Sequence, residues 1–96
     1  MKRQETVLMI QGREGFSINV NNFSKVRDYV VERSPLFGIK REDYSMRRIG
    51  NGCVEFVYRE KVSLERLGHL VNAINSDDDL RCEAAAYRQD ASRPAI

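Results

Sequence analysis

The side chains that could do chemistry in this 96-residue chain are few and scattered. His69 is its one histidine, and Cys53 and Cys82 are too far apart to form a C-x-x-C metal or redox motif. A general base needs an oriented nucleophile and a third group beside it, and the sequence indicates neither near His69. On a helix, His69 would lie about 200° around the axis from Leu67, on the solvent side. We therefore expect no catalytic residues and no enzymatic activity.

Asp77, Asp78 and Asp79 form an acidic run, and carboxylate oxygens are typical ligands of divalent metal ions. Consecutive residues cannot all point at one ion, and the spaced ligands and turn glycine of a calcium loop are missing. The glycines of the chain do not match a phosphate-binding loop either. We expect a solvated acidic loop, no metal site and no cofactor.

The composition is that of a small globular domain. Hydrophobic residues make up 42% of the chain, and sixteen Lys and Arg against fourteen Asp and Glu give a net charge of +2. This charge does not by itself imply a polyanion partner. The apolar run at residues 7–10 is much shorter than a membrane span or a signal-peptide core, so we expect a soluble, cytoplasmic protein with no membrane partner.

Several elements must position these side chains, and the first half of the chain predicts three of them. Residues 6–11 form an apolar run typical of a buried central strand. Residues 16–21 alternate apolar and polar side chains, which predicts a second strand. Phe23, Val26, Tyr29 and Val30 then recur at helical spacing, and Pro35 ends that helix.

A β-hairpin is predicted around Gly50-Asn51-Gly52, because Asn-Gly tolerates the positive φ angles of tight turns. It joins strands at residues 44–49 and 53–59. A three-residue loop places Met46 opposite Phe56 and Arg47 opposite Glu55, whereas a two-residue loop would pair Arg47 with Phe56. The chemistry of the pairs favours the three-residue loop.

The last third of the chain predicts a helix, a strand and a tail. Ser63 caps a helix whose apolar stripe is Leu64, Leu67, Val71 and Ile74, and Val62 staples onto Leu67. The helix ends near residues 75–76, residues 80–87 form the last strand, and residues 88–96 form a flexible tail after a single domain at 1–87.

The fold class is therefore α+β, with two helices on one face of a mostly antiparallel sheet. The element order is ββαββαβ, or the ferredoxin-like βαββαβ if residues 16–21 are not a strand. In this sheet the strands of Cys53 and Cys82 would be separated by one strand, which puts the cysteines roughly 10 Å apart and excludes a disulfide. Both are expected to be buried thiols.

A non-catalytic protein-interaction module is the function that these observations favour. It would act as a regulator, adaptor or inhibitor that docks on a larger protein, with a homodimer as one form, because an open sheet face or edge can pair with another chain. Val31, Leu36, Phe37 and Ile39 form the candidate apolar surface. The alternative for these residues is a loop that plugs the end of the core.

Two other functions stay open. A nucleic-acid-binding domain would stack bases on hairpin aromatics flanked by basic side chains, from the set Lys40, Arg41, Arg47, Arg48, Phe56, Tyr58, Arg59 and Lys61. Phe56 and Tyr58 could instead face the helices as core residues. A small-molecule sensor resembling the ACT domains is suggested by the βαββαβ order and by the glycines after the first strand.

Overall fold

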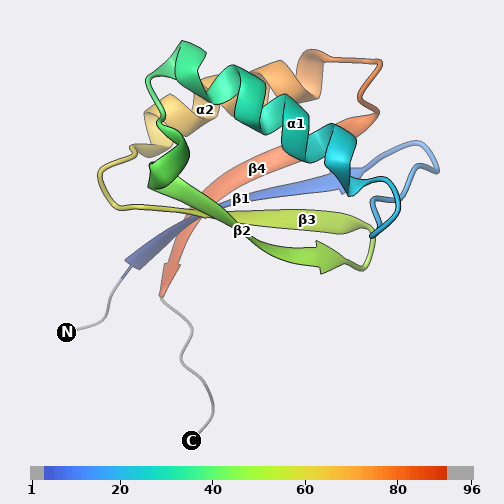
Figure 1. Ribbon diagram of the computed structural model, residues 1–96, viewed down its shortest axis with the longest axis horizontal. Coiled ribbons are helices and arrows are strands. Elements are labelled where there is room, and N and C mark those ends of the chain that lie inside the picture. The colour runs from blue at the N-terminus through green and yellow to red at the C-terminus, as the bar shows by residue number, and fades with distance from the viewer. Residues whose placement is uncertain (1–3, 91–96) are drawn as a thin grey trace, which may run out of the picture.

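Strand β1 lies inside the sheet, with a hydrogen-bonded strand on each side. The computed structural model describes residues 4–90, and their sheet has the strand order β2-β3-β1-β4. Both helices cover one face of this sheet (Figure 1). The elements follow in the order β1 (Gln4–Gly12), α1 (Phe23–Arg33), η1 (Ser34–Phe37), η2 (Arg41–Asp43), β2 (Tyr44–Gly50), β3 (Cys53–Tyr58), α2 (Leu64–Ser76) and β4 (Cys82–Asp90). The α+β class and the ferredoxin-like order are confirmed.

Residues 16–21 do not form the strand that their alternation predicts. Ile18 makes one isolated bridge to Gly52 and is fully buried, whereas Val20 is 68% exposed. Because β3 and β4 already occupy both edges of β1, a further strand after β1 finds no free edge beside it. The ββαββαβ alternative is therefore wrong.

The turn between β2 and β3 is shorter than the favoured three-residue loop. Gly50 pairs with Cys53, which leaves Asn51 and Gly52 as a two-residue turn. Both turn residues have positive φ angles, 56° and 80°, as the tight hairpin turns require.

A β-bulge in β2 nevertheless restores much of the predicted pairing. The register shifts between Met46 and Arg48, so that one extra residue, Arg47, is inserted in β2. Beyond the bulge Met46 lies opposite Phe56, as the three-residue loop predicted. The bulge therefore keeps the core side chains of β2 and β3 in register although the turn is tighter.

Helix α2 begins and ends where the sequence predicts. The Ser63 hydroxyl accepts a hydrogen bond from the Arg66 amide at 3.1 Å, and Val62 and Leu67 are both buried, as a hydrophobic staple requires. In helix α1, Val26 and Tyr29 are buried on the predicted stripe. The apolar sides of the two helices face the sheet and form the helical half of the core.

The core lies between these helices and the inward-facing residues of the strands, among them Leu8, Ile10, Phe56 and Cys82. Strand β4 continues to Asp90, because its last residues pair with the start of β1. The predicted tail is therefore wrong for residues 88–90, and residues 91–96 lie outside the described residues.

Candidate functional site

The turn between α1 and β2 carries most of the residues expected to form the interaction surface. Pro35 lies in the first turn of the 3-10 helix η1, and Gly38 caps the end of this helix in the left-handed region at φ 73°. The Gly38 amide donates to the Pro35 carbonyl at 3.1 Å, and the Ile39 amide donates to the Ser34 carbonyl at 3.0 Å. The buried Ser34 hydroxyl donates to the Val30 carbonyl at 2.6 Å. The turn is therefore fixed at both ends, and its backbone has little freedom left to lose when a partner binds.

The turn divides the four predicted residues between surface and core. Leu36 is 76% exposed, whereas Val31 and Phe37 are half-buried. Ile39 is 1% exposed and belongs to the hydrophobic core, so it is no part of an exposed surface. For Ile39 the alternative interpretation, a loop that plugs the end of the core, is correct. The exposed apolar surface is Leu36, with partial contributions from Phe37 and Val31.

Helix α2 supports this turn from the side. The ring of His69 stacks on the ring of Phe37, with centroids 6.1 Å apart. Arg66 Nη1 donates to the Gly38 carbonyl at 3.3 Å. His69 is exposed, as its helical position predicts, and its ring covers one side of Phe37.

The aromatic platform of the nucleic-acid hypothesis is absent from the sheet surface. Phe56 is 1% exposed and Tyr58 is 3% exposed, and both belong to the core on the helix-covered face. Burial raises the pKa of the Tyr58 hydroxyl well above its ordinary value. The prediction that these rings stack on bases is wrong, because the register of β3 turns them toward the helices.

Two of the basic residues beside the hairpin already contact other groups of the protein. Lys61 Nζ lies 3.1 Å from the buried carboxylate of Asp43. Arg41 donates to the Tyr44 carbonyl at 3.0 Å, and its guanidinium lies over the Tyr44 ring. Exposed basic residues that remain are Lys40, Arg48 and Arg59. The eight predicted residues therefore divide into two core aromatics, Phe56 and Tyr58, three cations that contact other groups of the protein, Arg41, Arg47 and Lys61, and three further exposed cations.

The face of the sheet opposite the helices carries an ion-pair network centred on Arg47. From β2 its Nη1 donates to Glu5 on β1, and its Nε donates to Glu55 on β3, both at 2.7 Å. Gln89 on β4 donates to the same Glu5 oxygen at 3.1 Å. Hydrogen bonding to Glu5 is the main reason that the pKa of Arg47 is raised, and burial acts in the opposite direction.

The same face of the sheet carries an apolar residue that is fully buried. Val7 alternates with the core residue Leu8, so it points away from the helices, yet it is 0% exposed. Arg47 crosses β3 to reach Glu5, and Tyr87 and Val57 lie beside Val7 on the neighbouring strands. The predicted register, with Arg47 opposite Glu55, is wrong because Arg48 is opposite Glu55, but the Arg47 side chain still bonds Glu55. Glu5 and Gln89 were missed, because their contribution depends on strand order.

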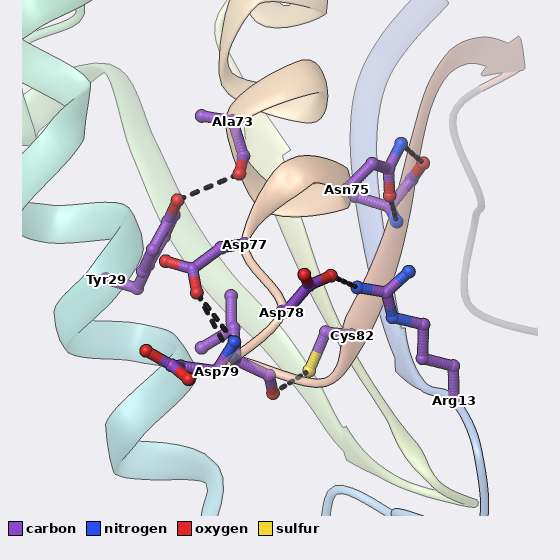
Figure 2. A network of polar contacts seen from close by, with 10 residues as sticks. Arg13, Tyr29, Ala73, Asn75, Asp77, Asp78, Asp79 and Cys82 are labelled. Atoms are coloured by element: carbon purple, nitrogen blue, oxygen red, sulfur yellow. Dashed lines mark hydrogen bonds and ion pairs between the residues drawn. The ribbon is translucent and has the colours of Figure 1, made fainter.

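The acidic loop after α2 is held by its own backbone (Figure 2). Asp77 Oδ1 accepts from the amides of Asp79 and Leu80, at 3.0 and 3.2 Å. Asp78 pairs with Arg13 at 3.5 Å. Among the described residues, no group of three or more His, Cys, Asp or Glu side chains is arranged to hold a metal ion. The carboxylate of Asp77 thus shapes the turn between α2 and β4.

The two cysteines are free thiols on strands separated by β1. Cys82 is fully buried, and its burial raises the pKa of its thiol, with Arg13 and Lys25 acting in the opposite direction. Cys53 is only half-buried, on the face away from the helices, so the prediction of a buried thiol holds for Cys82 alone.

The glycines after the first strand, on which the sensor hypothesis rests, have a local structural reason. A Cβ atom at Gly12 would lie 1.7 Å from the Phe16 carbonyl oxygen, so the turn itself requires glycine there. At the other end of the strand, a shallow hollow of about 550 Å³ is lined by acidic side chains that include Glu42 and Glu60. Neither feature points to a bound small molecule.

Comparison with known proteins yields a likeness of fold. No family model matches the chain, and no curated protein matches it. Among solved structures, a dimeric ferredoxin-like protein from an uncultured marine organism is similar, with 12% sequence identity and a TM-score of 0.46 over 99% of this chain and 100% of that one. This similarity concerns the fold alone. Within residues 4–90, no helix has the length and apolar character needed to cross a membrane.

Proposed function

We propose that this chain is a non-catalytic protein-interaction domain that docks on a larger protein as a regulator, adaptor or inhibitor. The observation that carries the proposal is Leu36, a large apolar side chain that is 76% exposed on a turn fixed by hydrogen bonds.

The energetics of the turn favour binding through Leu36. Burying a leucine side chain is worth about 1.5–3 kcal/mol. Ordering a flexible loop would offset part of that gain, but Pro35 and the bonds of Gly38 already hold this turn. A partner that covers Leu36 would therefore keep most of this free energy, because little ordering of the turn is needed.

Pull-down from cell lysate with and without nuclease, followed by calorimetry with the recovered protein, tests the proposal. The informative variant is Leu36→Asp, and Val20→Asp is its matched control, because Val20 is also strongly exposed, at 68%, but lies before the start of α1. We expect a stoichiometric protein partner that resists nuclease, is retained by Val20→Asp and is lost by Leu36→Asp.

Two results would overturn this function. One is the recovery of nucleic acid with no nuclease-resistant protein, which would favour the exposed Lys40, Arg48 and Arg59. The other is a partner that Leu36→Asp retains at wild-type affinity, which would move the interface away from the turn.

A further inference from the structure

The face of the sheet that the helices leave open has apolar side chains at its centre (Figure 1). They come from three neighbouring strands: Met9 from β1, Val57 from β3, and Ala85 and Tyr87 from β4. Met9 lies opposite Ala85, and Val57 and Tyr87 lie on either side of the buried Val7. Ala85 is exposed, and Met9, Val57 and Tyr87 are half-buried. The open face therefore has a continuous apolar surface that another molecule can cover.

Two opposite charges lie at the two edges of the same face. Arg48 on β2 is opposite Glu55, and Glu83 on β4 is opposite Gln11, so both charged residues share the side of the sheet that faces away from the helices. Strands β3 and β1 separate them, which puts the two edges roughly 14 Å apart. Among residues 4–90, neither side chain has an ion pair, and Glu83 accepts a hydrogen bond from the Gln11 amide. One chain therefore leaves a cation and an anion unpaired at opposite edges.

The edges of the sheet are less suited to pairing with another chain than its open face. Strand β2 is interrupted by the bulge at Arg47. On β4, the Asn75 side chain accepts from the Ala84 amide at 2.7 Å and donates to the Ala84 carbonyl at 3.3 Å (Figure 2). The exposed Arg88 follows further along β4. Bulges and charged side chains are the usual protection of an edge, so the open face is the better contact surface.

A second copy of the chain is complementary to this face in both shape and charge. A two-fold axis parallel to the strands, between β3 and β1, lays β2 of one copy over β4 of the other. Sheets that pack face to face are about 10 Å apart. Arg48 then lies over Ala85 of the second copy, and Glu83 of that copy is two residues further along the strand, within reach of two extended side chains. The symmetry forms this pair twice and sets the apolar centres of the two sheets against each other.

The ion-pair network of Arg47 lies on the same face and limits the contact little. Removal of water is the main cost of covering charged groups. Glu5 and Glu55 are already only 16% and 15% exposed, and Arg47 bonds both of them. Most of this cost is therefore met when the chain folds, before a second copy binds.

We propose that two copies of this chain pack through the open faces of their sheets, with Arg48 of each copy paired with Glu83 of the other. The apolar centre supplies the contact area, and the two ion pairs at the rim fix the direction in which the sheets lie. The η1 turn packs against α2, on the other side of the sheet, so Leu36 stays accessible in the dimer. The inference goes beyond the proposed function and does not depend on it.

Sedimentation velocity of the full chain over a concentration series tests the ion pairs. Arg48→Glu sets carboxylates against each other across the interface, and Glu83→Arg does the same with guanidinium groups. We expect the wild type to dimerise and each single variant to raise the dissociation constant about tenfold or more. The double variant R48E/E83R restores opposite charges and should recover dimerisation. Glu65→Arg is the matched control, because Glu65 is exposed on α2, and it should leave the dimer unchanged.

Thiol labelling shows which surface the second copy covers. Cys53 lies on the open face opposite Gln11, and the fully buried Cys82 is an internal reference in the same chain. Under a short pulse of thiol reagent, we expect the modification of Cys53 to slow in proportion to the fraction of chain that is dimeric. In Arg48→Glu the rate should not depend on the chain concentration.

Three results would overturn the proposal: a wild-type chain that stays monomeric at all concentrations, a double variant that dimerises as weakly as the single ones, or a dimer in which Cys53 reacts as fast as in the monomer. Leu36→Asp should leave the dimer intact, and Arg48→Glu should leave capture of the other protein intact. Failure of self-association and failure of the proposed function are therefore distinguishable.

Discussion

Removal of the Arg47 side chain should destabilise the domain far more than removal of its neighbour Arg48. Arg47 bonds Glu5 and Glu55 at 2.6–2.7 Å, and these carboxylates are only 16% and 15% exposed. Arg48 is an exposed residue one position further along β2, paired opposite Glu55. The two arginines are therefore a matched pair on one strand.

The magnitude follows from how far the network is removed from water. A hydrogen bond to a charged group contributes about 1.5–3 kcal/mol, and a fully exposed ion pair only about 0.2–1 kcal/mol. Arg47 itself is 34% exposed, so the solvent screens part of its two ion pairs. We expect Arg47→Ala to cost about 2 kcal/mol in the free energy of unfolding, or roughly 8–16 °C in Tm for a domain of this size. Arg48→Ala should change stability by about 0.5 kcal/mol or less.

Urea denaturation followed by circular dichroism measures both variants, and Arg47→Met separates the two contributions of the side chain. The methionine keeps an apolar stem over the sheet face that carries Val7 but removes the charge. If Arg47→Met is as unstable as Arg47→Ala, the ion pairs dominate; if it restores stability, the packing of the apolar stem of the side chain dominates. Equal, small losses for Arg47→Ala and Arg48→Ala would refute the reasoning.

Three further predictions concern the ends of elements and the titratable groups. Ser63→Ala should lower stability by about 1 kcal/mol, because the Arg66 amide loses its cap, and a loss within the error of thermal denaturation would contradict this role. Burial raises the pKa of Asp43, but hydrogen bonds from Lys61 and the Lys40 amide outweigh it and hold the pKa below the ordinary 3.8. The charged form of Asp43 therefore stabilises the folded state. The difference in unfolding free energy between wild type and Asp43→Asn should be at its full value at neutral pH and should shrink as the pH falls below about 3.8. A difference that grows in acid would be inconsistent with the ion pair. A thiol reagent applied to the native protein should modify Cys53 well before Cys82, as mass spectrometry of the labelled chain would show, and equal rates would mean that Cys82 is not buried.

Local chemistry in the sequence was sufficient for several elements. The Ser63 cap and the spacing of Leu67 and Ile74 act within one helix, and Asn51-Gly52 acts within one turn. These signals therefore located α2 and the β2–β3 hairpin. The exposed position of His69 on α2 was also predicted from its helical spacing.

Interactions between distant residues were not predictable in the same way. Arg47 and Glu5 are 42 positions apart, and they meet because β3 places β2 beside β1. Val20 alternates as a strand residue should, but β1 offers no free edge for its segment, and a central strand has only two.

The sequence by itself determined where α2 begins and ends and where the turn between β2 and β3 lies. Only the tertiary structure decided that Ile39 is core while Leu36 is surface, and that Asn75 covers one residue of the β4 edge. The physical reason is the distance along the sequence over which each interaction acts. Capping, turn formation and periodicity act over a few residues, whereas burial and edge protection depend on which strands become neighbours.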